Sequence, residues 1–139
     1  MQRARKNCAP LSSPPGAPNT LENPCQAALD CANSMLDALM RLNLEIVEDG
    51  YAPLAIGIGL NYGPAVIGMI GSSVRHNYSA IGDVVNVAAR VEGLTKDVGY
   101  DIVITDSVKV RLASNTGLTD LGERPIKGHT PVRVWGVNL

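Results

Sequence analysis

Aromatic side chains are scarce in this sequence, which has one Trp, four Tyr and no Phe among its 139 residues. A core must therefore be built from aliphatic side chains, and the aromatic platforms on which single-stranded nucleic acids stack are missing. Charge of one sign is not in excess either, since the formal net charge is −1. Proteins that bind nucleic acids normally carry a basic surface, so we expect no nucleic acid partner.

Long apolar runs and paired cysteine motifs are also lacking. No apolar run reaches the roughly 18 residues that span a bilayer, so we expect no membrane segment. The basic residues 1–6 are followed by prolines rather than by the apolar stretch of a signal peptide. Cys8, Cys25 and Cys31 show no CxxC spacing, which favours a reducing compartment. These absences predict a cytoplasmic protein, or the cytosolic end of a membrane-anchored parent protein.

The composition is that of a globular protein, with 45% hydrophobic and 18% charged residues. The length suits one domain of ordinary size. Residues 1–23 are rich in proline and show no periodic apolar pattern, which predicts an irregular N-terminal segment. We expect residues 24–139 to form the folded domain.

A helix is predicted from residue 24 to about residue 50. Asn23 is a favoured N-cap, Pro24 suits the first helical position, and Gln26 completes a pattern like a capping box. Apolar residues then recur at the spacing of an amphipathic helix, and Gly50 is a natural stop.

A glycine-rich strand is predicted over residues 54–60. Its bulky side chains alternate with Ala55, Gly57 and Gly59, so one face is nearly bare and suits the close approach of a helix or of another chain. Residues 65–70 are predicted to form a second strand after a turn at residues 61–64. We expect the two strands to pair as a hairpin.

The remaining elements alternate between helices and strands. We expect a polar loop over 71–77, a short strand over 78–81, a helix over 83–96, a strand over 101–104, a short helix capped by Thr105 and running to residue 112, and a hairpin of residues 118–126 and 131–137 around Lys127 and Gly128. This interleaving predicts an α/β or α+β fold.

The helix that starts at Asp83 carries a short polar stripe. Asp83, Asn86 and Arg90 are three and four residues apart, so they share one face of an otherwise apolar helix. One interpretation is an N-cap followed by a solvated stripe. The other is a pair of donors for an anion, because arginine matches phosphate geometry and asparagine can orient a hydroxyl or ribose oxygen.

The sequence gives little support for other ligand-binding motifs. Residues 57–63 form GxGxxxG, which is one residue longer than the dinucleotide fingerprint and is not followed by a helix. No P-loop sequence is present, and His76 and His129 have no ligands at zinc-site spacing. Lys127 lies in a predicted tight turn, where a lysine is either solvated or a point charge for a phosphate.

Several sequence blocks follow one another in a recognisable order. They are IGIGLNYG at 56–63, GMIGS at 68–72, Arg75, YSAIGDVVNVAARVEG at 78–93, IKG at 126–128 and PVRVW at 131–135. This series resembles the C-terminal part of the class III adenylate/guanylate cyclase catalytic domain, of the bacterial type linked to sensor modules. The resemblance runs from about Ala9 to the end of the chain.

The resemblance implies an α+β fold, a ferredoxin-like α/β sandwich of the nucleotidyl cyclase type. It also implies conversion of a nucleoside triphosphate to a 3′,5′-cyclic nucleotide and pyrophosphate, in sites shared by a head-to-tail dimer. By position, Asn86 would orient the ribose, Arg90 would stabilise charge on the α-phosphate, and Lys127 would contact the terminal phosphates. Ser79 falls at the base-discriminating position, where a serine does not decide between ATP and GTP; the family's bacterial bias favours ATP.

The family's two metal-binding aspartates have no counterpart. They lie upstream of the helix predicted to start at Pro24, whereas this chain has no aspartate before Asp30 and only Glu22 as an earlier acid. The family's cofactor, Mg²⁺ or Mn²⁺ in a two-metal site, thus lacks its ligands here. We expect an N-terminally truncated domain, without the first strand and the metal-site hairpin, that is inactive alone.

Two alternatives stay open beside this hypothesis of an inactive fragment. The chain could form a homodimer, or a heterodimer in which another chain brings the metal-binding aspartates. It could also be a non-catalytic binding or regulatory partner of a complete cyclase.

Overall fold

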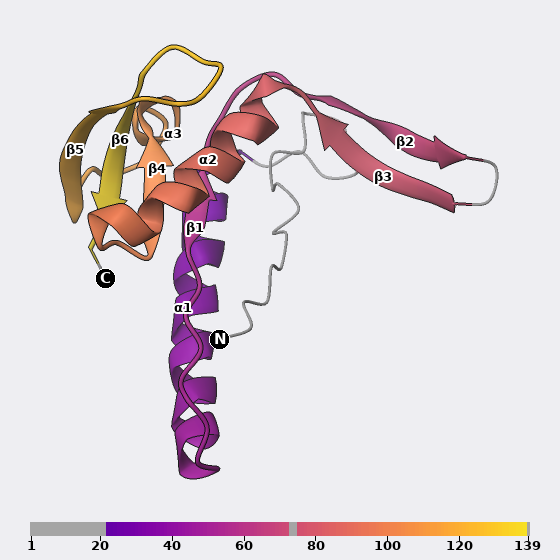
Figure 1. Cartoon of the computed structure of the whole chain (residues 1–139). Helices are drawn as coiled ribbons and strands as arrows, with labels where there is room; N and C mark the ends of the chain where they lie inside the picture. The colour runs from indigo at the N-terminus through magenta and orange to yellow at the C-terminus, as the bar shows by residue number, and fades with distance from the viewer. Residues whose placement is uncertain (1–21, 73–74, 139) are drawn as a thin grey trace.

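The computed structural model describes residues 22–72 and 75–138, and for residues 66–81 it describes the backbone only. Figure 1 shows a small sheet and its helices, from which one long helix and one hairpin project. In chain order the elements are α1 (Pro24–Glu48), β1 (Ile58–Leu60), β2 (Val66–Ser72), β3 (Arg75–Ile81), α2 (Asp83–Val98), β4 (Ile102–Thr105), α3 (Asp106–Lys109), β5 (Leu118–Arg124) and β6 (Val132–Val137). Much of the predicted N-terminal segment, residues 1–23, lies outside the described residues.

Helix α1 begins where the sequence predicts. The side chain of Asn23 accepts a hydrogen bond from the backbone N–H of Gln26 at 3.1 Å, which confirms Asn23 as the N-cap. The second part of the predicted capping box, in which the Gln26 side chain would bond back to the backbone N–H of Asn23, is wrong. The Gln26 side chain instead donates to Asp30 at 2.8 Å and accepts from the backbone N–H of Ala113 at 3.2 Å. Gln26 thereby ties α1 to the segment that follows α3.

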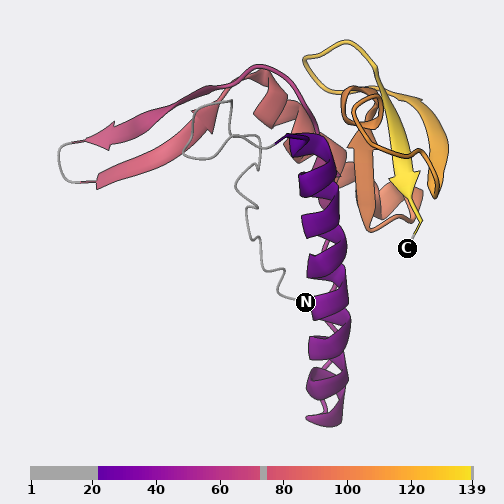
Figure 2. The same cartoon turned by 180° about the vertical axis from the view of Figure 1, so that it is seen from behind.

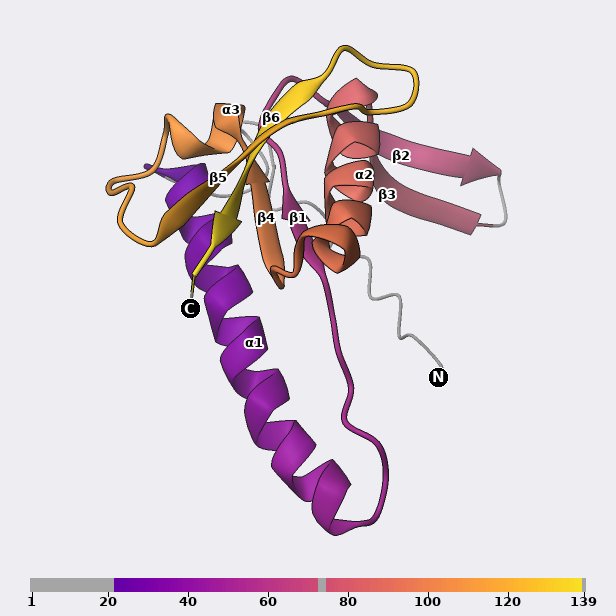
Figure 3. The ribbon, with the colours of Figure 1, turned by 60° about the vertical axis from the view of Figure 1, so that its left-hand side comes forward.

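The main sheet has four strands in the order β1-β4-β6-β5. Strand β1 pairs in parallel with β4, with Ile58 opposite Ile102, and the remaining pairs are antiparallel. The predicted hairpin of residues 54–60 and 65–70 is therefore wrong. Parallel strands need a crossover connection, and here the chain passes through β2, β3 and α2 before it returns beside β1, as Figure 3 shows.

Strands β2 and β3 form a separate hairpin that extends away from the sheet in Figures 1 and 2. Its register runs from Val66 opposite Ile81 to Ser72 opposite Arg75. Residues 71–72 and 75–77 thus belong to strands, and the loop predicted over 71–77 is wrong for them. The hairpin is held by backbone hydrogen bonds, which polar residues make as readily as apolar ones, so composition alone was misleading.

Helices cover both faces of the sheet. All four residues of β4 are buried, because successive side chains point to opposite faces and each face is covered. Ile102 and Ile104 pack with the first half of α1, including Leu29 and Leu36. Val103 packs on the other face with α2, in a cluster formed by Val87, Val91, Val103, Ile126 and Val134.

The bare face of β1 is covered by α2. A Cβ placed on Gly59 would lie 2.3 Å from the backbone nitrogen of Glu92 and 2.6 Å from the carbonyl oxygen of Ala88. A Cβ on Gly57 would lie 2.1 Å from the Thr95 hydroxyl. The predicted close approach of a helix is confirmed, and the alternative that another chain approaches this face is wrong because α2 already occupies it.

The second half of α1 extends beyond the sheet (Figures 1 and 3). It exposes large apolar side chains, with Met40 61% and Leu44 66% exposed, and Tyr51 beyond the helix is 73% exposed. The returning chain is tied to the helix by Asn43, whose side chain bonds the backbone N–H and carbonyl of Leu54, each at 2.8 Å. Among the helices of the described residues, none has the length and apolar character that crossing a membrane requires.

Candidate active site

Helix α2 has one buried and one exposed side. Its buried residues recur at helical spacing. They are Val84, Val87, Val91 and Thr95. Asn86 and Arg90, the two predicted catalytic residues, are both exposed, as is Asp83. The stripe predicted from spacing therefore lies on the solvent side of the helix, available to a ligand.

The start of α2 differs from the prediction. Gly82 is the N-cap residue, with φ +155°, and Asp83 is the first helical residue. Asp83 is therefore not the predicted N-cap. Its carboxylate Oδ2 instead lies 2.9 Å from Nε2 of His129, in the loop between β5 and β6. This contact connects the polar stripe of α2 to the loop that carries Lys127.

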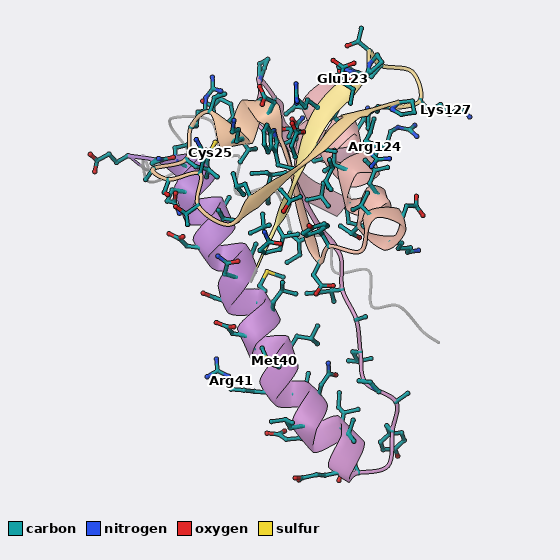
Figure 4. The ribbon with its side chains drawn as sticks, turned by 90° about the vertical axis from the view of Figure 1, so that its left-hand side faces the viewer. Cys25, Met40, Arg41, Glu123, Arg124 and Lys127 are labelled. Atoms are coloured by element: carbon teal, nitrogen blue, oxygen red, sulfur yellow. The ribbon has the colours of Figure 1, made fainter. Side chains whose placement is uncertain are left out.

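Lys127 lies in a tight turn, as the sequence predicts. The backbone N–H of His129 donates to the carbonyl of Ile126 at 3.0 Å, and Gly128 adopts φ +80°, a conformation that glycine adopts at little cost. Ile126 is 5% exposed and packs in the cluster with Val91 of α2. Lys127 is exposed beside this anchor, at the loop end of the hairpin in Figure 4.

Asn61 holds the first turn of α2 against the sheet. Its Nδ2 donates to the carbonyl of Val84 at 3.0 Å, and its Oδ1 accepts from the hydroxyls of Thr105 at 2.9 Å and Ser107 at 3.1 Å. Sequence analysis assigned Asn61 to a turn and Thr105 to a helix cap, but Thr105 makes no cap hydrogen bond. The signal for this network is a polar residue at the carboxyl end of each of two parallel strands.

Replacing Asn61 tests this connection. Asn61→Ala would leave the buried Thr105 hydroxyl, 1% exposed, without its Asn61 partner and free the Val84 carbonyl. We expect the free energy of unfolding to fall by about 2 kcal/mol, measured by urea denaturation. The matched variant Asn115→Ala replaces an exposed asparagine and should change it by less than about 0.5 kcal/mol. Equal stability of the two variants would contradict the role of Asn61.

Ser79 lies in the hairpin of β2 and β3, and Arg124 lies at the end of β5. Ser79 lies in β3 opposite Gly68, and its side chain is outside the described residues, so its predicted role in base recognition stays a prediction. Arg124 was missed by sequence analysis. It ends β5 three residues before Lys127, and its Nε is buried without a hydrogen-bond partner among the described residues. Figure 4 shows both cations at the same end of the hairpin.

Two of the three cysteines, Cys25 and Cys31, lie among the described residues, and both are free thiols. Cys25 is buried in the cluster under α1, and this burial raises the pKa of its thiol, an effect that the positive charge of Arg111 partly opposes. Cys31 is free and exposed, and Cys8 lies outside the described residues.

A cavity formed by the described residues lies away from the predicted site. A cavity of about 250 Å³ lies at the opposite end of the sheet, lined by Gly99, Tyr100, Asp101, Val137 and Asn138, and none of the predicted site residues lines it. Across residues 22–72 and 75–138, no three His, Cys, Asp or Glu side chains are grouped so that they could hold a metal ion.

Comparison with known proteins identifies the family. The family described as the adenylate and guanylate cyclase catalytic domain matches residues 15–138, and the chain belongs to this family. Among solved structures, the adenylyl cyclase CyaB from P. aeruginosa superposes with a TM-score of 0.78 at 26% identity, over 88% of this chain and 63% of that one. The guanylyl cyclase Cya2 gives a TM-score of 0.74 at 30% identity, over 88% and 61%. The predicted fold class, an α+β sandwich of the nucleotidyl cyclase type, is confirmed.

Curated relatives agree with this assignment. An adenylate cyclase from Anabaena cylindrica is 41% identical over 85 residues, which are 58% of this chain and 17% of the relative. Adenylate cyclase 1 from Rhizobium meliloti is 31% identical over 103 residues, which are 74% of this chain and 16% of the relative. The chain thus spans about a sixth of the length of these two relatives.

Proposed function

We propose that this chain supplies one half of a shared nucleotidyl cyclase site and needs a second chain to complete it. The observation that carries the proposal is the exposure of Asn86 and Arg90 on one side of α2, next to the loop of Lys127. Polar groups that act on a nucleotide are usually set in a concave site. Here they stand on an open surface, which suits a site closed by a partner.

The proposed reaction joins the 3′-oxygen of the ribose to the α-phosphorus. The bond between that phosphorus and the oxygen bridging to the β-phosphate breaks, and pyrophosphate leaves. In this scheme Asn86 orients the ribose, Arg90 stabilises the negative charge that develops on the α-phosphate, and Lys127 binds the terminal phosphates. Ser79 contacts the base. We favour ATP over GTP as substrate, in line with the relatives named adenylate cyclases.

The partner in this proposal brings the metal-binding carboxylates. The family's Mg²⁺ or Mn²⁺ ions find no suitable cluster among the described residues, so the chain's contribution is confined to binding and charge stabilisation. A second observation supports association: the distal half of α1 exposes apolar side chains such as Met40 and Leu44, labelled in part in Figure 4. Gathered apolar side chains on a surface often mark protein interfaces.

A complementation assay tests the proposal. The purified chain is assayed for cyclic AMP and cyclic GMP with Mn²⁺ or Mg²⁺, alone and mixed with a complete class III domain. In that domain the arginine aligned with Arg90 is replaced by alanine, so its own sites are inactive. We expect product only in the mixture, because a mixed dimer combines the partner's carboxylates with Asn86 and Arg90 of this chain.

Each other outcome has a definite meaning. Product from the chain alone would overturn the inference that its metal carboxylates are missing. Association without product, measured by size-exclusion chromatography, would instead support a non-catalytic regulatory partner. A mixture that shows neither association nor product would contradict both functions.

A further inference from the structure

The ring of His129 contacts two oxygen acceptors. Nε2 lies 2.9 Å from the carboxylate of Asp83, and Nδ1 lies 2.8 Å from the backbone carbonyl of Thr130. A neutral imidazole carries one N–H, whereas the protonated ring carries two. Both contacts are therefore hydrogen bonds when the ring is charged. The Thr130 hydroxyl, 3.3 Å from Nδ1, is a weaker alternative partner in the neutral form.

This contact lies where the loop meets the nucleotide-facing helix. Lys127 lies between two loop residues that contact α2 and act as its anchors. Ile126 is buried among Val87 and Val91, and His129 contacts Asp83, the first residue of the helix. The turn that joins the anchors is closed by the hydrogen bond from His129 N–H to the Ile126 carbonyl. The contact of Ile126 with α2 involves no charge, whereas the contact of His129 with Asp83 is an ion pair only when the ring is protonated.

We propose that Asp83 and protonated His129 form a latch that holds the Lys127 loop against the start of α2, so that both act as positioning residues for the triphosphate. This inference rests on the proposed function. It adds that nucleotide affinity depends on the contact between His129 and Asp83. Asp83 contacts the ring, Glu123, Arg124 and Lys127 are charged residues at that end of the hairpin, and Arg133 lies opposite Glu123.

The expected size of the effect follows from the exposure of the pair. The side chains of His129 and Asp83 are 31% and 65% exposed, and exposed ion pairs change equilibria by about two- to fivefold. We take the contact of Lys127 with the terminal phosphates to contribute mainly to binding of the nucleotide. Weaker positioning should therefore raise KM and leave kcat at saturating nucleotide close to its original value.

The kinetic test uses the full chain in the complementation mixture. His129→Gln and Asp83→Asn should each raise KM about two- to fivefold, and the double variant no further, because both remove the same contact. His129→Arg, which keeps a positive charge, should keep a low KM.

A control variant removes a different ion pair of the same hairpin. Hydrogen bonding from Arg133 holds the pKa of Asp120 below its usual value, so this ion pair is formed in the same hairpin without His129. Asp120→Asn should leave KM unchanged. A matching rise in KM for Asp120→Asn would show that any damage to the hairpin has the same effect, and would overturn the proposal.

Hydrogen exchange tests the contact between Asp83 and His129 independently of cyclase activity. In the full chain without nucleotide, the amides of residues 127–130 should exchange faster in Asp83→Asn than in the original chain. Equal exchange would overturn the latch whatever the kinetics show. If no mixture forms product, the proposed function and the positioning role both fail, while exchange still decides the contact. Faster exchange with unchanged KM would overturn the positioning role alone.

Discussion

Arg90→Ala is expected to lower product formation in the complemented mixture by about 10²–10³-fold, which corresponds to about 3–4 kcal/mol of transition-state stabilisation. Arg90 is exposed on the side of α2 that carries Asn86, and its guanidinium matches the geometry of a phosphate. Charge develops on the α-phosphate in the transition state, so the loss should fall on kcat. Initial rates of cyclic nucleotide formation at saturating substrate measure it.

Two further variants sharpen this prediction. Lys96→Ala removes an exposed cation from another side of the same helix and should leave the rate unchanged. Arg90→Lys keeps the charge but loses the planar fork, so it should recover only a small part of the rate. If Arg90→Ala forms product as fast as the original chain while size-exclusion chromatography still shows association, this arginine takes no part in the chemistry. The regulatory alternative would then be favoured.

Gly59→Ala is expected to destabilise the chain by about 3 kcal/mol, with a fall in Tm of about 10 °C. The added Cβ would lie 2.3 Å and 2.6 Å from backbone atoms of Glu92 and Ala88, so it has no flexible side chain to displace. Relief requires a shift of the whole of α2, which also carries Asn86 and Arg90. Thermal unfolding followed by circular dichroism measures the effect.

A second glycine provides the matched control. Gly93 lies within α2, and a Cβ at this position would meet no atom within 4 Å. Gly93→Ala should therefore stabilise the chain by up to about 1 kcal/mol, because alanine is the better helix former. If Gly59→Ala melted at the same temperature as the original chain, the close packing of α2 on β1 would be wrong.

The elements that local signals define were predicted well. Asn23 and Pro24 marked the start of α1, the spacing of Val84, Val87 and Val91 marks the buried side of α2, and the hairpin of β5 and β6 lies where it was expected. Caps, turns and helical periods depend on residues a few positions apart, so a sequence displays them directly.

Strand pairing was predicted poorly because it depends on distant residues. Strand β1 was expected to pair with its neighbour in sequence but pairs with β4, more than forty residues later. The bare face around Gly59 showed that something packs closely there, and the structure shows that α2 does so. Alternating side chains define the two faces of a strand, but they do not name the partner at its edge.

In the candidate site too, the local features were predicted from the sequence and the long-range contacts were not. The sequence by itself determined that Asn86 and Arg90 share one side of a helix and that Lys127 occupies a turn, because helical spacing and the glycine after the lysine are local properties. Only the tertiary structure decided that His129 reaches Asp83 and that Asn61 ties α2 to the ends of two strands. These contacts join residues 20 to 50 positions apart, and their formation depends on how α2 packs across the sheet.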